Sequence, residues 1–337
     1  MAEVMDSEVF YLKHINKLRR SFSDPGSLNN DTHEILGELE DSKKTHKSKK
    51  TPRYAVVNMH VPQKTPIDDL RGTSRNVYSN DETERRCKLA ACYRLVDLMG
   101  WSEGIFNHIS LRVSQDKDEF LINPFGLLYN EVTASSLLSV DLEGNIKDAG
   151  TTCLGINKAG YVLHSTIHEA RPDINCIIHV HTPDAAAISS MKCGFLRISQ
   201  ESLIVGNVSY HDYFGILIDD AEKESIKNDL GPDNMIMFLR NHGVVVCGRD
   251  IETAFHMLCT LMEACRIQVR AVSVGVENLN LISDEVFQQV QNSATASAVK
   301  MGSSDQVSLS EYYFEAYMRW LDDQGHCTGY SYLLPDL

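Results

Sequence analysis

The sequence lacks any apolar run that approaches the roughly 20 residues a helix needs to cross a bilayer. Its first ten residues are polar, so the apolar stretch of a signal peptide is also missing. Basic charge is scarce, since 32 Lys and Arg stand against 46 Asp and Glu, which gives a net charge of −14. Phosphate contacts need a basic face, and this balance argues against nucleic-acid binding by the folded part. We therefore expect a soluble globular protein of the cytoplasm with no transmembrane segment.

Cysteine pairs with a recognisable spacing are also absent. The nine cysteines show no repeated spacing and no C-x-x-C pair. Several lie in apolar surroundings, for example Cys176, Cys247 and Cys259. This pattern indicates reduced thiols in a core rather than a disulfide framework.

Apolar residues make up 43% of the 337 residues, which is enough for a large core in one large or two small domains. Residues 1–64 differ, because they mix the acidic stretch 34–41 with a basic cluster at 43–50. We interpret residues 1–64 as a mostly disordered polar arm. Its basic cluster is solvated charge in this interpretation, and the alternative is a contact with an acidic partner such as a membrane surface.

Apolar periodicity predicts alternating helices and strands after the arm. A helix is expected from Asp81 to the stop at Gly100, and another over 159–170 that leads into a strand at 176–181. The remaining predicted elements are strands at 107–112, 119–123, 235–239 and 244–246, and helices at 183–191, 219–230 and 251–272. Helix followed by strand is the signature of an α/β fold.

The composition also suggests boundaries within the folded part. We expect a domain over 65–290, a Ser- and Ala-rich loop over 291–308, and a C-terminal aromatic helix and tail over 309–337 that complete the domain. The amphipathic segment 309–321 is rich in tyrosine and other aromatics, which are either core or a docking face. We favour the core.

Three histidines are the strongest candidate for a functional site. His179 and His181 stand two residues apart in the predicted strand, so both side chains face the same way. His242 follows the predicted strand 235–239, at the end where open sheets usually hold ligands. Three neutral imidazoles suit zinc and other divalent metals and leave a position open for water or substrate. The alternative is that these histidines only satisfy local hydrogen bonds.

The sequence HVH at 179–181, the upstream helix with His164, and NHG about 60 residues downstream together resemble the class II aldolase and adducin family. The resemblance extends over roughly residues 65–335. Five runs look like the adducin head domain, namely 86–102, 123–137, 179–196, 210–223 and 325–332. The family's fold is an α/β/α sandwich with a central mixed β-sheet, and we expect the same class II aldolase-like α/β fold here.

The resemblance implies a metal site without its catalytic acid. Enzymes of the family hold a divalent metal, usually zinc, with three histidines, and the matching residues are His179, His181 and His242. A glutamate on the preceding helix moves protons in those enzymes. Its position is Gly160 here, and neighbours on a helix such as Lys158 and Tyr161 project in other directions. We therefore expect no ordinary aldolase activity, an interpretation that another ionisable side chain in the space beside Gly160 would contradict.

The family's substrate-phosphate pocket is altered as well. Its usual Gly-Asn-x-Ser is represented by 107–110, with His108 in second place, and its Thr-Gly pair is represented by Phe125 and Gly126. Two serines are replaced by Lys158 and Ala159. These changes remove hydrogen-bond donors for an anion, although His108 and Lys158 leave room for a different acidic ligand.

The function implied by the resemblance is a non-catalytic assembly and interaction module of the actin–spectrin membrane skeleton, at the cytoplasmic face of the plasma membrane. Expected partners are actin, spectrin and other adducin-like subunits, in dimers or tetramers. The sequence ends at Leu337 without the neck and lysine-rich tail of adducins, so we expect weakened actin binding or pairing with a longer relative. One alternative is a metal-dependent aldolase, epimerase or dehydratase that uses the three histidines with His108 or Lys158. Another is a metal that serves only as a structural clip between strands.

Overall fold

The computed structural model describes residues 65–70, 77–114, 116–213, 220–297 and 307–333. The expected disordered arm, residues 1–64, lies outside the described residues. The contacts of the chain separate Met1–Val61 from a larger unit, Pro62–Leu337, and the fold described below belongs to that larger unit.

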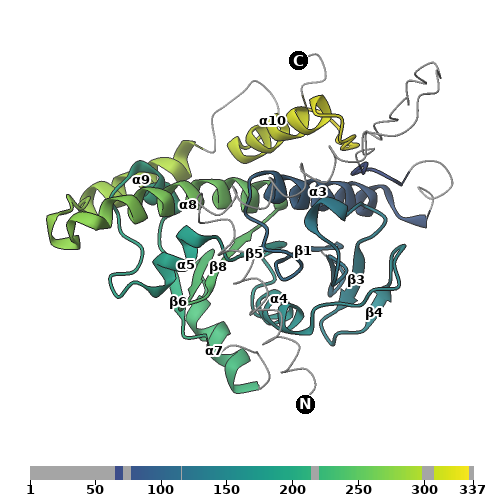
Figure 1. The fold of residues 1–337 in the computed structure, drawn as a ribbon, viewed down its shortest axis with the longest axis horizontal. Helices are drawn as coiled ribbons and strands as arrows, with labels where there is room; N and C mark the ends of the chain where they lie inside the picture. The colour runs from purple at the N-terminus through teal and green to yellow at the C-terminus, as the bar shows by residue number, and fades with distance from the viewer. Residues whose placement is uncertain (1–64, 71–76, 115, 214–219, 298–306, 334–337) are drawn as a thin grey trace, which may run out of the picture. The chain divides into compact units, whose positions relative to one another are not determined.

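An eight-stranded β-sheet runs through the described residues in the order β4-β3-β2-β1-β5-β8-β7-β6 (Figure 1). Strands β6 and β7 are parallel, whereas the neighbours from β4 to β7 pair antiparallel. The strands are β1 (His108–Arg112), β2 (Glu119–Ile122), β3 (Leu138–Asp141), β4 (Ile146–Asp148), β5 (Cys176–Val180), β6 (Ser209–His211), β7 (Ile236–Leu239) and β8 (Gly243–Gly248). The mixed α/β sheet predicted from the sequence is confirmed.

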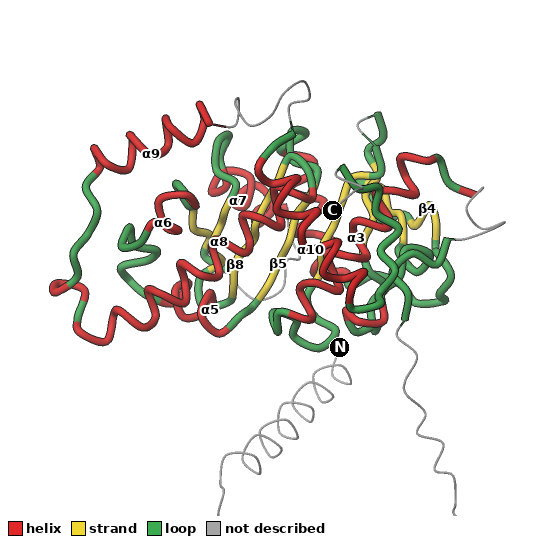
Figure 2. The backbone as a smooth tube through the Cα atoms, turned by 90° about the horizontal axis from the view of Figure 1, so that it is seen from above, coloured by secondary structure: helices red, strands yellow, loops and turns green. Residues whose placement is uncertain are grey.

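Helices cover both faces of this sheet (Figures 1 and 2). Helices α3 (Asn80–Leu98), α5 (Pro183–Ser190) and α8 (Ile251–Ala271) pack on one face, and α4 (Lys158–Ala170) and α7 (Asp220–Leu230) pack on the other. Successive strand residues alternate between the two cores: Ile178 packs with α3 and α8, and its neighbour Ile177 packs with α4 and α7. The other helical elements are η3 (Tyr129–Glu131), α6 (Gln200–Val205), η4 (Val272–Val274), η5 (Val276–Asn278), α9 (Asp284–Ser297) and α10 (Leu309–Asp323).

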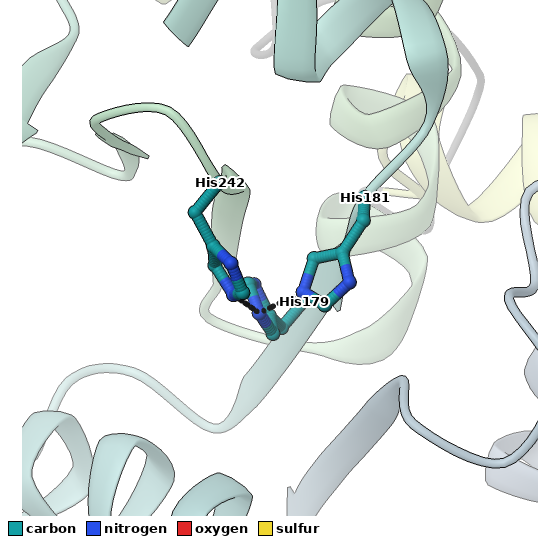
Figure 3. Close-up of side chains that lie close together, drawn as sticks. All are labelled: His179, His181 and His242. Carbon is teal, nitrogen blue, oxygen red and sulfur yellow. Dashed lines mark hydrogen bonds between the residues drawn. The ribbon is translucent and has the colours of Figure 1, made fainter. Parts of the chain in front are cut away.

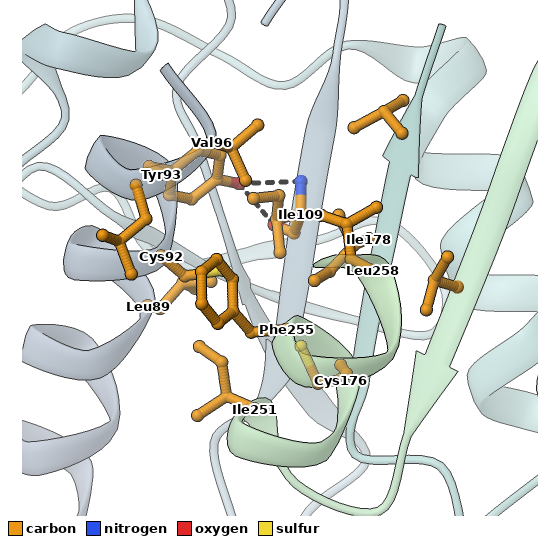
Figure 4. Close-up of a cluster of buried hydrophobic side chains, with 14 of the residues drawn as sticks. Leu89, Cys92, Tyr93, Val96, Ile109, Cys176, Ile178, Ile251, Phe255 and Leu258 are labelled. Atoms are coloured by element: carbon orange, nitrogen blue, oxygen red, sulfur yellow. Dashed lines mark hydrogen bonds between the residues drawn. The ribbon is translucent and has the colours of Figure 1, made fainter. Parts of the chain in front are cut away.

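Tyr93 joins helix α3 to the strands beneath it (Figure 4). The side chain is fully buried, and its hydroxyl accepts hydrogen bonds from the backbone N–H of Ile109 at 3.0 Å and of Asn123 at 3.1 Å. Apolar side chains surround it, including Leu89 and Val96 of the same helix. A single hydroxyl group therefore fixes the position of α3 over β1 and over the end of β2.

The expected loop over 291–308 is wrong in its first part, because helix α9 continues to Ser297. Composition misled the prediction, since alanine favours helices more than any other residue. The helix is anchored by Phe287, which is buried under the guanidinium of Arg197 at 3.5 Å from the ring centroid. Residues 298–306 lie outside the described part of the chain.

The C-terminal aromatic segment forms α10 and packs on α8 and α3. Phe314 is buried, Tyr313 and Tyr317 are partly buried against the core, and Trp320 is 40% exposed, so the aromatics divide between the core and the surface. After α10 the chain returns to residues 65–70, where the backbone N–H of Ile67 donates to the carbonyl of His326 at 2.9 Å.

All nine cysteines lie within the described residues, and none of them forms a disulfide bond. Five of them are buried, as expected for core thiols. Among the described residues, none of the helices combines the length and the apolar character that a membrane crossing requires.

Candidate metal centre

The sheet topology explains why the three histidines meet. Strands β5 and β7 both run antiparallel to β8, which lies between them, so they are parallel to each other and end at the same edge. His179 lies near the end of β5, and His181 follows the strand by one residue. His242 lies in the short turn that joins β7 to β8. The three histidines singled out from the sequence therefore lie together at one edge of the sheet.

The turn Asn241-His242-Gly243 fits its place for local reasons. Asn241 adopts a left-handed backbone with φ of 58°, a conformation that asparagine tolerates better than most residues. A Cβ atom on Gly243 would lie 2.5 Å from the carbonyl oxygen of Val180 and 2.8 Å from the Cδ2 of His181, so only glycine permits this close approach of β8 to β5. His242 is further positioned by its backbone N–H, which donates to the Oγ of Ser189 at 3.2 Å.

The imidazoles of the three histidines point toward one another (Figure 3). One nitrogen from each ring lies within 4.8 Å of the others. The Nε2 of His179 is 3.3 Å from the Nε2 of His242 and 2.7 Å from the Nε2 of His181. Neighbouring ligands of a tetrahedral zinc stand about 3.4 Å apart, so the spacing of His179 and His242 suits a bound ion, and the Nε2 atoms of His179 and His181 would have to move apart to share it.

Hydrogen bonds on the outer nitrogens orient two of the rings. The Nδ1 of His179 lies 3.0 Å from the carbonyl oxygen of Val244, and the Nδ1 of His181 lies 3.1 Å from the Oε2 of Glu103. Because a carbonyl only accepts, we assign the proton of His179 to Nδ1, and the carboxylate favours the same tautomer for His181. Both Nε2 atoms then present lone pairs to each other. A cation between them would relieve this repulsion, and these residues therefore fit a divalent metal.

The electrostatics of the site favour the neutral form that binds metals. Burial first, and then the neighbouring His181 and His108, hold the pKa of His179 well below its usual value. Burial and His181 lower the pKa of His242 to about 4. The pKa of His181 is lowered by burial, with Glu103 acting in the opposite direction. At neutral pH the three rings are therefore uncharged, and each has one unprotonated nitrogen that can bind a metal.

The space beside Gly160 is filled by another imidazole. A Cβ atom built on Gly160 would lie 2.8 Å from the Cγ of His108 and would overlap its Cδ2 and Nε2. An ionisable side chain therefore reaches this position, contrary to the expectation that none would. His108 is 5% exposed, and burial together with His164 holds its pKa well below the usual value.

Three other residues singled out from the sequence, Lys158, Tyr161 and Ser110, are either exposed or already hydrogen-bonded. The hydroxyl of Tyr161 donates to the carbonyl of Leu142 at 2.5 Å, and the side chain of Lys158 is exposed. Ser110 is fully buried and bonds to His164 and His168. The serine of the altered phosphate motif is therefore not free to receive an anion.

Two residues of the site were not singled out from the sequence. Glu103 lies in the loop before β1, far from the histidines along the chain, and no local pattern links it to His181. Tyr213 stacks on His242, with ring centroids 4.1 Å apart and an interplanar angle of 27°. Its signal was only its membership of the run 210–223.

A mixed sheet covered by helices on both faces, with three histidines converging at the ends of neighbouring strands, defines a protein of the class II aldolase type. Comparison with known proteins agrees. The model of the class II aldolase and adducin N-terminal domain matches residues 87–269. Alpha-adducin of Rattus norvegicus is 49% identical over 286 residues, and gamma-adducin of Homo sapiens is 44% identical over 276 residues. The chain belongs to the class II aldolase and adducin family.

These alignments cover 84% and 80% of this chain, respectively, and the chain spans 39% of the length of each of the two adducins. Among solved structures, an aldolase II superfamily protein from Pseudomonas syringae is 43% identical with a TM-score of 0.69, over 76% of this chain and 99% of that one. L-fuculose 1-phosphate aldolase from Glaciozyma antarctica PI12 is 25% identical with a TM-score of 0.61, over 72% and 91%. The family thus contains both adducins and an aldolase.

Proposed function

We propose that this chain is a non-catalytic assembly and interaction module of the actin–spectrin membrane skeleton. The observation that supports this most strongly is the 49% identity to an alpha-adducin over 84% of the chain. We assign the role to residues 65–290, completed by 309–337. The proposed partners are actin, spectrin and other adducin-like subunits, and the proposed location is the cytoplasmic face of the plasma membrane.

An ionisable side chain, His108, does lie beside Gly160, but its properties are those of a poor catalytic acid or base, so the absence of aldolase activity remains our proposal. A glycine offers no side chain for proton transfer at the position that matches the family's glutamate. The imidazole of His108, which fills the space, is buried, and its pKa is lowered, so it is a weak base. Its Nδ1 is also engaged with His164 at 2.7 Å. An exchangeable acid or base next to the substrate normally contributes about 10²–10⁴-fold to the rate.

Co-sedimentation and hybrid assembly test the proposal. The purified chain should pellet with actin filaments in the presence of spectrin, and it should form mixed oligomers with full-length alpha-adducin that size-exclusion chromatography with light scattering detects. Serum albumin, another acidic protein, is a suitable control for nonspecific trapping of protein among the pelleted filaments. Absence of both co-sedimentation and hybrid oligomers would remove the basis of the assembly function.

The intact histidine trio favours one second candidate, a metal-dependent enzyme that acts on a small carbonyl compound. When bound, zinc would polarise the oxygen of such a substrate, and His179, His181 and His242 would hold it. Zinc-loaded protein should then turn over at least one member of a broad panel of hydroxy-carbonyl compounds, and His179→Ala should abolish the turnover. A panel without turnover would refute this candidate.

A metal in the non-catalytic module would have a structural role. The three histidines connect the end of β5 to the turn between β7 and β8, so zinc would clip these strands together. Elemental analysis should then find about one zinc per chain. Protein that stays metal-free after dialysis against zinc would contradict the clip.

A further inference from the structure

The size of His108 complements the missing side chain of Gly160. Gly160 lies in the first turn of α4 and is buried, and the ring of His108 occupies the volume directly above its Cα. Any larger residue at 160 would require the ring to move, and the ring has little freedom because it is 5% exposed. The His108 ring therefore fills the space that the lack of a side chain at Gly160 leaves, and the two residues form a complementary pair.

A chain of hydrogen bonds fixes the His108 ring in this place. The Nδ1 of His108 lies 2.7 Å from the Nε2 of His164, and the Nδ1 of His164 lies 2.5 Å from the Oγ of Ser110. Ser110 in turn lies 2.8 Å from the Nε2 of His168, whose Nδ1 is 3.2 Å from the carbonyl of Ile174.

One assignment of proton positions satisfies every hydrogen bond from His108 to the carbonyl of Ile174. The carbonyl of Ile174 only accepts, so His168 donates from Nδ1 and accepts at Nε2 from the Ser110 hydroxyl. The Oγ of Ser110 then accepts from the Nδ1 of His164, and the Nε2 of His164 accepts from the Nδ1 of His108. The three histidines of this hydrogen-bond series, His108, His164 and His168, are all neutral in this arrangement. Each link has one direction, so the His108 ring has one orientation.

The ring also borders the candidate metal centre. His108 on β1 pairs in register with His179 on β5, and both side chains leave the sheet on the face covered by α4. The ring centroids of His108 and His179 are 5.0 Å apart. A side chain that extended from Gly160 toward the metal ligands would have to pass through the position of the His108 ring.

We propose that His108 is an internal plug that closes the α4 side of the histidine centre to small molecules. The class of ligand excluded is a compact chelator with two adjacent oxygens, because that class would use an open face of a three-histidine metal. This inference rests on the proposed non-catalytic function and gives it a physical cause. The centre could then hold a cation and remain closed to a carbonyl substrate.

A double-mutant cycle on thermal unfolding tests the complementary pair without any metal. Gly160→Ala should lower the melting temperature of the wild-type chain, because the new methyl group overlaps the fixed ring. In an H108A background the same substitution should raise it, since the space is empty and alanine favours a helix over glycine. Gly155→Ala is the matched control, because no atom lies within 4 Å of its added Cβ. Its effect should be the same in both backgrounds, and equal effects of Gly160→Ala in both backgrounds would overturn the pair.

Ligand access to cobalt-substituted protein tests the plug itself. Acetohydroxamate should change the visible spectrum of cobalt-loaded H108A at a concentration about tenfold lower than that needed for the wild type. His256→Ala, which removes a partly buried histidine of α8, should behave like the wild type. Equal hydroxamate affinity of wild type and H108A would overturn the plug.

The two measurements also separate this inference from the proposals above. If none of the variants takes up cobalt, the metal site fails, and the plug around a metal fails with it. Failure of the assembly function would be seen in co-sedimentation and would leave the cobalt spectra and the melting temperatures unchanged.

Discussion

The Nδ1 of His181 and the Oε2 of Glu103 lie 3.1 Å apart, although 78 residues separate them in the chain. Glu103 comes from the loop between α3 and β1, and its own backbone N–H donates to the Oδ1 of Asn107 at 2.5 Å. This carboxylate fixes the ring orientation of His181 and raises the basicity of its inner nitrogen. The loop before β1 thereby becomes part of the histidine centre.

Replacement of Glu103 should weaken metal binding. We expect E103A to reduce zinc affinity by about 10–100-fold, and E103Q by less, because the amide oxygen still accepts the hydrogen bond. Competition with a chromophoric chelator measures the affinity. Glu143→Gln removes an exposed carboxylate in the turn between β3 and β4 and should leave the affinity unchanged. Equal affinities of wild type and E103A would show that the contact has no role in binding.

Zinc should stabilise the folded chain by mass action. At a free zinc concentration of about 100 times the dissociation constant, the free energy of unfolding should rise by about 2.7 kcal/mol. The increase should vanish in H242A, which removes one of three ligands, and persist in H256A. Urea unfolding with and without zinc measures the difference. A zinc effect of the same size in H242A would locate the binding elsewhere.

Acid should destabilise the fold through its buried neutral histidines. Burial, followed by Arg112, lowers the pKa of His168 to about 3, and burial lowers those of His108 and His164 as well. An unfolded histidine titrates near 6.5, so between about pH 6.5 and 3 the unfolded state binds more protons than the folded state. Stability is therefore complete above pH 6.5 and falls as the pH decreases, by up to about 1.4 kcal/mol per pH unit for each such histidine.

Urea unfolding at intervals between about pH 7.5 and 4.5 measures this slope. His168→Gln should be less stable at neutral pH and should show a shallower slope, because one proton fewer is taken up on unfolding. H256Q removes a less buried histidine and should retain most of the slope. A slope in H168Q as steep as in the wild type would contradict the assignment.

Loss of the Tyr93 hydroxyl should destabilise the fold without changing its shape. Tyr93→Phe leaves the buried N–H groups of Ile109 and Asn123 without their acceptor, and we expect a cost of about 1–3 kcal/mol. Tyr317→Phe removes the hydroxyl of a partly buried tyrosine of α10 and should change stability by less than about 0.5 kcal/mol. The midpoints of urea denaturation give both values. Equal effects of the two substitutions would mean that Tyr93 acts through packing alone.

Local spacing was sufficient to predict the elements that hold the histidines. The period of two in 176–181 predicted strand β5, although the strand ends at Val180 and His181 lies just beyond it. The run 235–239 predicted β7 and the position of His242 at its end. Strands β4 and β6 have only three residues each, too few to show a period, and they were not predicted.

The sequence by itself determined the chemistry of the three imidazoles, the α/β order of the elements and the absence of a carboxylate at Gly160. These follow from residue types and from periods within one segment. Only the tertiary structure decided that His108 fills the space at Gly160 and that Glu103 orients His181. Both contacts depend on the register between β1 and β5 and on the packing of α4 and of the loop before β1, and no local pattern encodes such distances.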